Sequence, residues 1–315
     1  EAHRWNVAFG LAAVGMLISI INFQFTKHEL GPIGLQPGHP DAIVKTKALP
    51  KWVEYAVYLG TLLLIPLIQI MVSNTQYTDY FMYTIGPLTL IYLFYEMSKV
   101  GKVERNKLIA ALIFILFSIV FWGIYEQSGG SLSIFAANNL NDTILGTSVK
   151  LDPNGVNNSG GALFIIALAP LFGLLWLWLA KRRLEPNTLI KFGLGFLFLG
   201  LGFYVLYATR FFAVDGITSL DVFTLALLVI TVGELCLSPI GLSIMTKLSP
   251  AKLQGIMMGL WFLASAYGQY VAGLIGANMA EAREGDTLMD KLITYTEGYK
   301  QLGMYSLIAG AILRN

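Results

Sequence analysis

The sequence predicts an all-α membrane protein. The chain is 56% hydrophobic and only 13% charged, whereas soluble globular domains are about 45–50% apolar and about 25% charged. Its apolar residues gather in long runs, many of them near the roughly 20 residues that a helix needs to cross a bilayer. The runs are too long for membrane strands and do not alternate between apolar and polar residues. Helices are therefore the predicted spanning elements.

Nine apolar runs are candidate membrane spans. They cover approximately residues 5–25, 52–72, 79–98, 108–137, 161–180, 188–212, 219–246 and 253–280, and a last run from about residue 301. Between the fourth and fifth runs, residues 137–160 are rich in Asn and Gly, which is typical of an external loop. The segment 26–51 contains four prolines and is predicted to be an internal linker.

The distribution of basic residues predicts the orientation of these spans. When the connections alternate between two sides, with residues 26–51 inside, 15 of the 21 Lys and Arg residues fall inside and 6 outside. Cytoplasmic connections of membrane proteins carry such an excess of Lys and Arg. One missing or additional span would remove the asymmetry, so the count supports nine spans.

The composition disfavours several function classes. The single cysteine, Cys236, excludes an internal disulfide and a cysteine-rich metal site. His3, His28 and His39 all lie outside the apolar runs, which disfavours an intramembrane zinc site or imidazole relay. The net charge of +2 gives no indication of nucleic-acid binding. A membrane enzyme is disfavoured as well, because no histidine accompanies an intramembrane serine.

Two carboxylates lie deep inside apolar runs. Glu126 follows VFWGIY and Glu234 lies near the middle of the run 219–246. A charged side chain at such depth costs about 2.5–3.5 kcal/mol on insertion scales and usually faces a bundle interior or a water-filled cavity. A protonated Glu that only hydrogen-bonds a neighbouring helix is the structural alternative. Gly129, Gly130 and Pro239 can open the helix backbone nearby, which is tolerated where protein or water replaces the lost hydrogen bonds.

The surroundings of the two acids suggest a transport chemistry. Trp122 lies one helical turn before Glu126, and Ser238 one turn after Glu234, so each shares a face with its acid. Trp122 could equally be a packing residue. A neutral carboxylic acid can carry a proton, and an ionised one can receive a cationic group. Together the residues predict a proton-coupled carrier for an amine-bearing solute.

Three separated stretches of the sequence resemble a known family. They are FWGIYEQSGGSLSIFA at 121–136, GELCLSPIGLS at 233–243 and SPAKLQGIMMGLWFLASAYGQYVAG at 249–273. All three resemble the proton-coupled oligopeptide transporter family of the major facilitator superfamily, and FGLAAVGML at 9–17 resembles its sixth helix. The resemblance implies helix six at 1–25, a cytoplasmic linker at 26–51, a lateral helix hairpin at 52–98 and a C-terminal six-helix bundle at 99–315. It also implies a truncated last helix and an N-terminal bundle that the chain lacks.

The same resemblance implies roles for particular residues. Glu234 is expected to receive the amino terminus of a peptide, and Glu126 to couple transport to protons. The residues expected to line the peptide site are Trp122, Trp261, Phe262, Ser238 and Ser265. Family members often have an Asn-Pro pair at the outer start of helix eight, where this sequence has Gly161 and Ala162. A contact to the peptide backbone is therefore expected to be absent.

The resemblance thus implies a symporter that imports di- and tripeptides by alternating access in the bacterial inner (plasma) membrane. No cofactor or metal is expected, and the proton is the coupling ion. The expected partners are a small peptide, protons, the lipid bilayer and the N-terminal half of the same transporter. Two alternatives remain: a transporter of nitrate or another small solute, which Glu234 disfavours because it repels anions, and a membrane receptor or enzyme.

Overall fold

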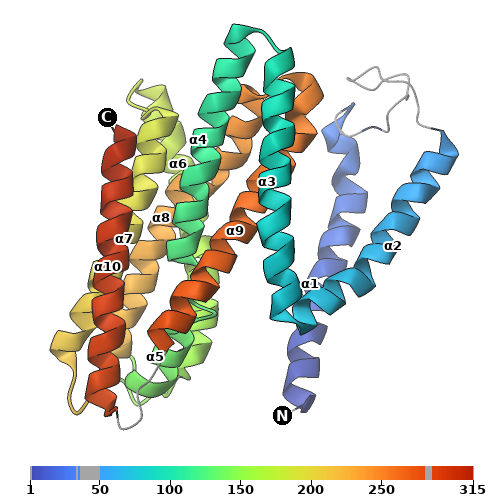
Figure 1. Cartoon of the computed structure of the whole chain (residues 1–315). Helices are drawn as coiled ribbons and strands as arrows, with labels where there is room; N and C mark the ends of the chain where they lie inside the picture. The colour runs from blue at the N-terminus through green and yellow to red at the C-terminus, as the bar shows by residue number, and fades with distance from the viewer. Residues whose placement is uncertain (1, 33–34, 36–49, 281–285, 315) are drawn as a thin grey trace. The chain divides into compact units, whose positions relative to one another are not determined.

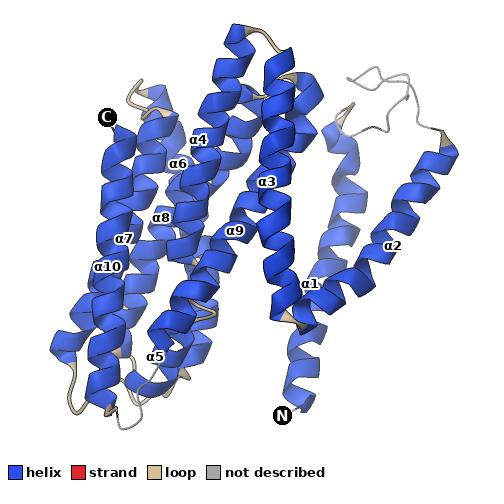
Figure 2. Ribbon diagram, in the orientation of Figure 1, coloured by secondary structure: helices blue, strands red, loops and turns tan. Residues whose placement is uncertain are grey.

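The computed structural model describes residues 2–32, 35, 50–280 and 286–314, and its regular elements are helices (Figures 1 and 2). The predicted all-α class is confirmed. Six predicted spans are helices long and apolar enough to cross a membrane: 9–30, 51–73, 102–125, 153–181, 188–212 and 220–248. By contacts the chain divides into two units, one up to Phe81 and one from Met82 onward.

The first unit contains α1 (Ala2–Thr26), α2 (Lys51–Ser73) and the first part of α3 (Thr75–Lys99). The apolar window of α2 has a mean hydropathy of 2.0, and none of it is buried within the protein. Such a helix is stable when lipid surrounds it. The predicted linker begins as a short 3₁₀ helix, Lys27–Leu30, but most of it lies outside the described residues.

The second unit is a bundle built around α7 (Thr188–Ala208), which packs against both α8 and α10. The other contacts that matter for the site join α4 to α8, α4 to α9 and α6 to α8. Phenylalanines fill the interior: the rings of Phe114 and Phe192 lie 5.1 Å apart and those of Phe121 and Phe196 lie 5.5 Å apart, both edge to face. The remaining bounds are α4 Lys102–Tyr125, α5 Ser131–Asn139, α6 Pro153–Lys181, α8 Leu220–Leu248, α9 Gln254–Ala280 and α10 Leu288–Arg314.

Glycines bring the bundle helices close together. A Cβ atom on Gly233 of α8 would lie 2.7 Å from the carbonyl oxygen of Gly195 on α7. A Cβ atom on Gly200 would lie 3.0 Å from the carbonyl oxygen of Gly303 on α10. At Gly255 and Gly259 of α9, by contrast, a Cβ would meet no described atom within 4 Å outside the adjoining residues and backbone of its own helix.

The predicted span 108–137 is two helices. α4 ends at Tyr125, and α5 begins at Ser131 after a turn of five residues, 126–130. Glu126 leaves the helical conformation with φ −78° and ψ 40°, while its N–H still donates to the carbonyl of Trp122 at 2.9 Å. Gly130 closes the turn by donating to the carbonyl of Gln127 at 3.0 Å. Glu126 therefore lies in a helix break rather than inside a helix.

Two further helices begin earlier than hydropathy predicts. α6 begins at Pro153, not near residue 161, because the Asp152 side chain caps it by accepting from the N–H of Gly155 at 3.0 Å. Proline at the first helical position strengthens this start. α10 begins at Leu288, not near residue 301, where Thr287 and Asp290 form a capping box with side-chain to backbone bonds of 3.0 and 3.2 Å.

Candidate functional site

The two membrane-embedded carboxylates come together where α4 ends. Tyr125, the last residue of α4, donates a hydrogen bond from its hydroxyl to Oε2 of Glu234 in the middle of α8. Glu126 is the next residue in the chain, so the two acids lie on either side of the same tyrosine. All three side chains are half-buried. The fold thus joins two acids that are far apart in the sequence through one tyrosine.

The turn that carries Glu126 is anchored by its neighbour Gln127. This side chain is fully buried, and its Nε2 donates to the carbonyls of Gly123 at 3.1 Å and of Ala272 on α9 at 3.4 Å. Its Oε1 accepts from the hydroxyl of Ser131 at 2.8 Å. The side chain of Gln269 on α9 lies near the Glu126 carboxyl group. The helix break is therefore fixed to both α5 and α9.

Trp122 lies at the crossing of α4 and α9. Its ring meets Phe121 and Tyr125 edge to face, with centroids 5.5 and 5.2 Å apart. A Cβ atom on Gly268 of α9 would collide with the Cβ of Trp122, so glycine is required for this approach. Trp122 does pack, as one reading of the sequence predicts. Its indole Nε1 is nevertheless buried without a hydrogen-bond partner in the described part of the chain.

The remaining predicted binding residues lie in different environments. Trp261 is only 5% exposed, and its ring lies against α8 at Gly241, where a Cβ would overlap it. Phe262, the next residue along α9, is 62% exposed. Ser238 and Ser265 are half-buried. Trp261 therefore belongs to the packed core rather than to the exposed side of α9, and substrate contact by these four residues stays a prediction.

Sequence reasoning missed two residues beside the two acids, Tyr125 and Gln269. Tyr125 stood beside Glu126 in the sequence, and Gln269 lies one helical turn beyond Ser265 on α9. A Cβ atom on Gly161 of α6 would lie 4.0 Å from the hydroxyl of Tyr125 and 3.9 Å from that of Thr231. Gly161, which stands where the resemblance expects Asn, thus faces the contact between Tyr125 and Glu234, whereas Ala162 is exposed.

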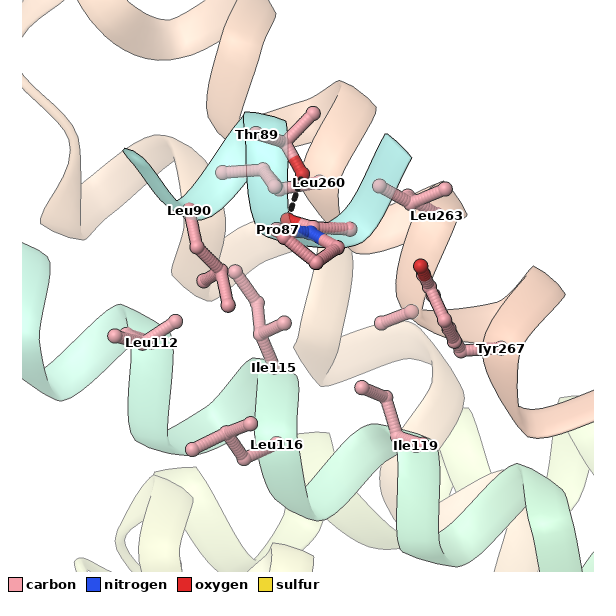
Figure 3. A pocket seen from close by; sticks show the side chains of 12 residues that line it. Pro87, Thr89, Leu90, Leu112, Ile115, Leu116, Ile119, Leu260, Leu263 and Tyr267 are labelled. Atoms are coloured by element: carbon pink, nitrogen blue, oxygen red, sulfur yellow. Dashed lines mark hydrogen bonds between the residues drawn. The ribbon is translucent and has the colours of Figure 1, made fainter. Parts of the chain in front are cut away.

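The second unit also contains an apolar cavity of about 210 Å³ between α3, α4 and α9. Figure 3 shows side chains such as Leu90, Ile115 and Tyr267 around this space. Thr89 also lines the cavity, and its hydroxyl donates a hydrogen bond to the carbonyl of Gly86 within α3 at 2.8 Å. None of the predicted site residues lines this cavity. Among the described residues, no group of three His, Cys, Asp or Glu side chains could hold a metal ion.

Comparison with known proteins finds several peptide transporters. The chain is 31% identical over 292 residues to the peptide transporter YePEPT of Yersinia enterocolitica subsp. palearctica, covering 89% of this chain and 56% of that protein. It is 29% identical to a di-/tripeptide transporter of Lactococcus lactis, with 98% and 61% covered. It is 27% identical to dipeptide and tripeptide permease B of Aeromonas hydrophila, with 99% and 61% covered.

Solved structures give the same result. The crystal structure of peptide transporter POT in complex with sulfate matches with a TM-score of 0.66 and 29% identity, over 98% of this chain and 60% of that one. Tetrameric PepTSo2 matches with a TM-score of 0.73 and 26% identity, over 98% and 62%. The fold is therefore the helical bundle of the major facilitator superfamily. The chain spans 56–61% of the length of these curated relatives.

The apolar helices and these bacterial relatives make the chain a multi-pass integral protein of the bacterial inner membrane. A family model described as PTR2, POT family, matches residues 1–290. That match covers well over half of the chain and agrees with the three sequence stretches that resemble the family. The chain belongs to the POT family.

Proposed function

We propose that this chain forms part of a proton-coupled symporter that imports di- and tripeptides by alternating access. Relatives that carry the names of peptide transporters and permeases support the substrate class. The observation that carries the proposal is the convergence of two membrane-embedded acids, Glu126 and Glu234, through Tyr125. Two carboxylates in one partly desolvated site suit a carrier that handles an ammonium group and a proton together.

Glu234 receives the amino terminus of the peptide in this proposal. A half-buried carboxylate attracts an ammonium group more strongly than an exposed one, because the surrounding protein screens the charges less than water does. The aromatic side chains of Trp122 and Phe262 provide walls that accept many peptide side chains. Trp261 supports this site from the core, where it packs against α8.

Glu126 is the proton-coupling acid. It lies in the helix break, where Gln269 and the anchored Gln127 fix its position. Protonation removes its charge and with it any attraction to a cation on an opposing helix bundle, which permits closure around the peptide. Deprotonation on the inner side then follows release. No covalent bond is made or broken in this cycle, so no enzymatic activity is expected.

The opposing bundle corresponds to the part of the relatives that this chain does not span. The exposed side of α9 with Phe262 and Gln269 is the side that such a bundle would cover. Residues 249–255, which form the connection from α8 and the start of α9, would lie at the inner junction of the two bundles. The partners are accordingly a small peptide, protons, the lipid bilayer and this second bundle.

Peptide uptake tests the role of Glu234. Glu234→Ala removes the ammonium receptor, and we expect uptake of a labelled dipeptide into proteoliposomes to fall to background under an inward proton gradient. Glu104→Ala is the matched control, since Glu104 is exposed in the first turn of α4 and should leave uptake unchanged. Unlabelled dipeptide should compete with the label and nitrate should not. Competition by nitrate alone would instead support the anion transporter.

A further inference from the structure

The hydrogen bond from Tyr125 occupies only one of the two carboxylate oxygens of Glu234. Oε2 accepts from the Tyr125 hydroxyl, and Oε1 accepts no hydrogen bond from any described residue. A carboxylate has about four lone-pair sites on its two oxygens, so Glu234 can hold the tyrosine and a second donor at once. The tyrosine therefore leaves one oxygen for a cationic ligand.

Tyr125 is held more firmly than the carboxylate it contacts. Its ring stacks on Phe121 with centroids 5.8 Å apart and meets Trp122 edge to face at 5.2 Å. Phe121 is itself fully buried in the bundle core. Glu234, by contrast, has three side-chain torsions and no other hydrogen bond within the described residues. The hydroxyl therefore sets the direction of the carboxylate, rather than the reverse.

The neighbouring helix leaves space for this contact. Gly161 of α6 faces the hydroxyl of Tyr125, and even a single Cβ there would come within 4.0 Å of it. The hydroxyl of Thr231, the other near group, donates to the carbonyl of Leu227 in its own helix at 2.8 Å and is thus occupied. A longer side chain at position 161 would enter the space around the Tyr125 hydroxyl.

We propose that Tyr125 is a positioning residue that orients Glu234 so that Oε1 meets the free amino group of the peptide. This inference rests on the proposed function, because it assigns the ligand of Glu234. Tyr125 touches the carboxylate and not the peptide ammonium, so it acts through Glu234. It makes the site selective for substrates with a free amino terminus, since only an ammonium group gains from the oriented oxygen.

Transport kinetics of Tyr125→Phe test this proposal. The variant keeps the ring and its stacking and removes only the hydroxyl. A hydrogen bond to a charged group contributes enough for about a tenfold rise in KM for a dipeptide when it is lost, and we expect kcat to stay within about twofold. Tyr295→Phe is the matched control: Tyr295 is buried, lies on α10 beside Phe135 and Tyr299, away from the two acids, and its loss of a hydroxyl should leave KM unchanged.

A double-variant cycle separates positioning from general packing. In a Glu234→Gln background, dipeptide affinity is measured as the Kd of a labelled dipeptide for the purified transporter, and Tyr125→Phe should cause no further rise in Kd, because the oriented charge is already gone. An equal rise in that background, or an unchanged or lowered KM in the single variant, would overturn the proposal. Gly161→Val crowds the hydroxyl without altering Tyr125 and should raise KM in the same way; an unchanged KM there also counts against it. If the unaltered transporter takes up no dipeptide, the proposed function fails first.

Discussion

Gln127 shows how one residue fixes the geometry of a neighbouring functional group. It is fully buried, its side chain makes three hydrogen bonds, and it ties the break between α4 and α5 to α9. Glu126 is the preceding residue, and its own side chain is only half-buried. The position of the proposed coupling acid thus depends on a neutral amide that takes no proton itself.

Gln127→Ala should destabilise the protein. The substitution removes the partner of the Ser131 hydroxyl and the donor to the Ala272 carbonyl, and a buried group left without its partner costs about 1–3 kcal/mol. Thermal unfolding in detergent measures the effect as a lowered midpoint. Gln254→Ala is the control, because Gln254 is exposed and makes one long bond of 3.4 Å to the carbonyl of Thr246. Equal midpoints for the two variants would refute the anchoring role.

For single residues, the sequence reveals those whose burial in a membrane span costs much free energy, and it does not reveal those whose burial costs little. Glu126 and Glu234 stand out because a charge inside an apolar run costs free energy that something must offset. Tyr125 costs little in a membrane helix, so composition gives no reason to select it. Its partner is 109 residues away in the sequence, and only the packing of α4 against α8 brings the two together.

Glycine contacts set the distances between the helices of the bundle. Gly233 of α8 lies against the backbone of α7, with hypothetical Cβ distances of 2.7 Å to the Gly195 oxygen and 2.9 Å to the Leu199 nitrogen. Backbone atoms cannot rotate away as the end of a side chain can. The middle of α8, which carries Glu234, can therefore pack directly against α7 only because residue 233 has no side chain.

Gly233→Ala should force α7 and α8 apart. Overpacking of this kind typically costs about 1–3 kcal/mol, so we expect a clear fall in the thermal unfolding midpoint and in the amount of protein that survives purification. Gly259→Ala on α9 provides the comparison. The added Cβ would contact no described atom of a neighbouring element, and alanine has a higher helix propensity than glycine. A variant at Gly233 as stable as the one at Gly259 would contradict the close contact.

The sequence predicts which segments are helical better than it predicts where each helix begins and ends. Hydropathy alone places the starts of α6 and α10 too late, because both helices begin with polar residues that lie before the apolar run. Their capping residues, Asp152 and Thr287, were readable in the sequence. The break after α4 was only partly visible, in Gly129 and Gly130. Likewise, small residues at helical spacing do not reveal which of them face a neighbour, as Gly259 shows.

Charge is distributed asymmetrically over the molecule. Lys102, Lys181 and Lys247 lie at the predicted inner ends of bundle helices, and over the whole chain the predicted topology places 15 basic residues inside and 6 outside. On the predicted outer side, Asp142 and Lys150 pair at 2.8 Å and Arg210 pairs with Glu297 at 2.5 Å. In this predicted orientation, α4 begins inside at Lys102, and the helix break with Glu126 lies toward the outer side.

The most direct test of proton coupling compares two transport modes of Glu126→Gln in proteoliposomes. One mode is accumulation of a labelled dipeptide driven by an inward proton gradient, and the other is exchange against unlabelled dipeptide loaded inside, which needs no gradient. Glutamine keeps the size of the side chain and cannot carry the proton. We expect this variant to lose gradient-driven accumulation and to retain exchange. Accumulation that still follows the proton gradient would contradict the assignment of Glu126 as the coupling acid.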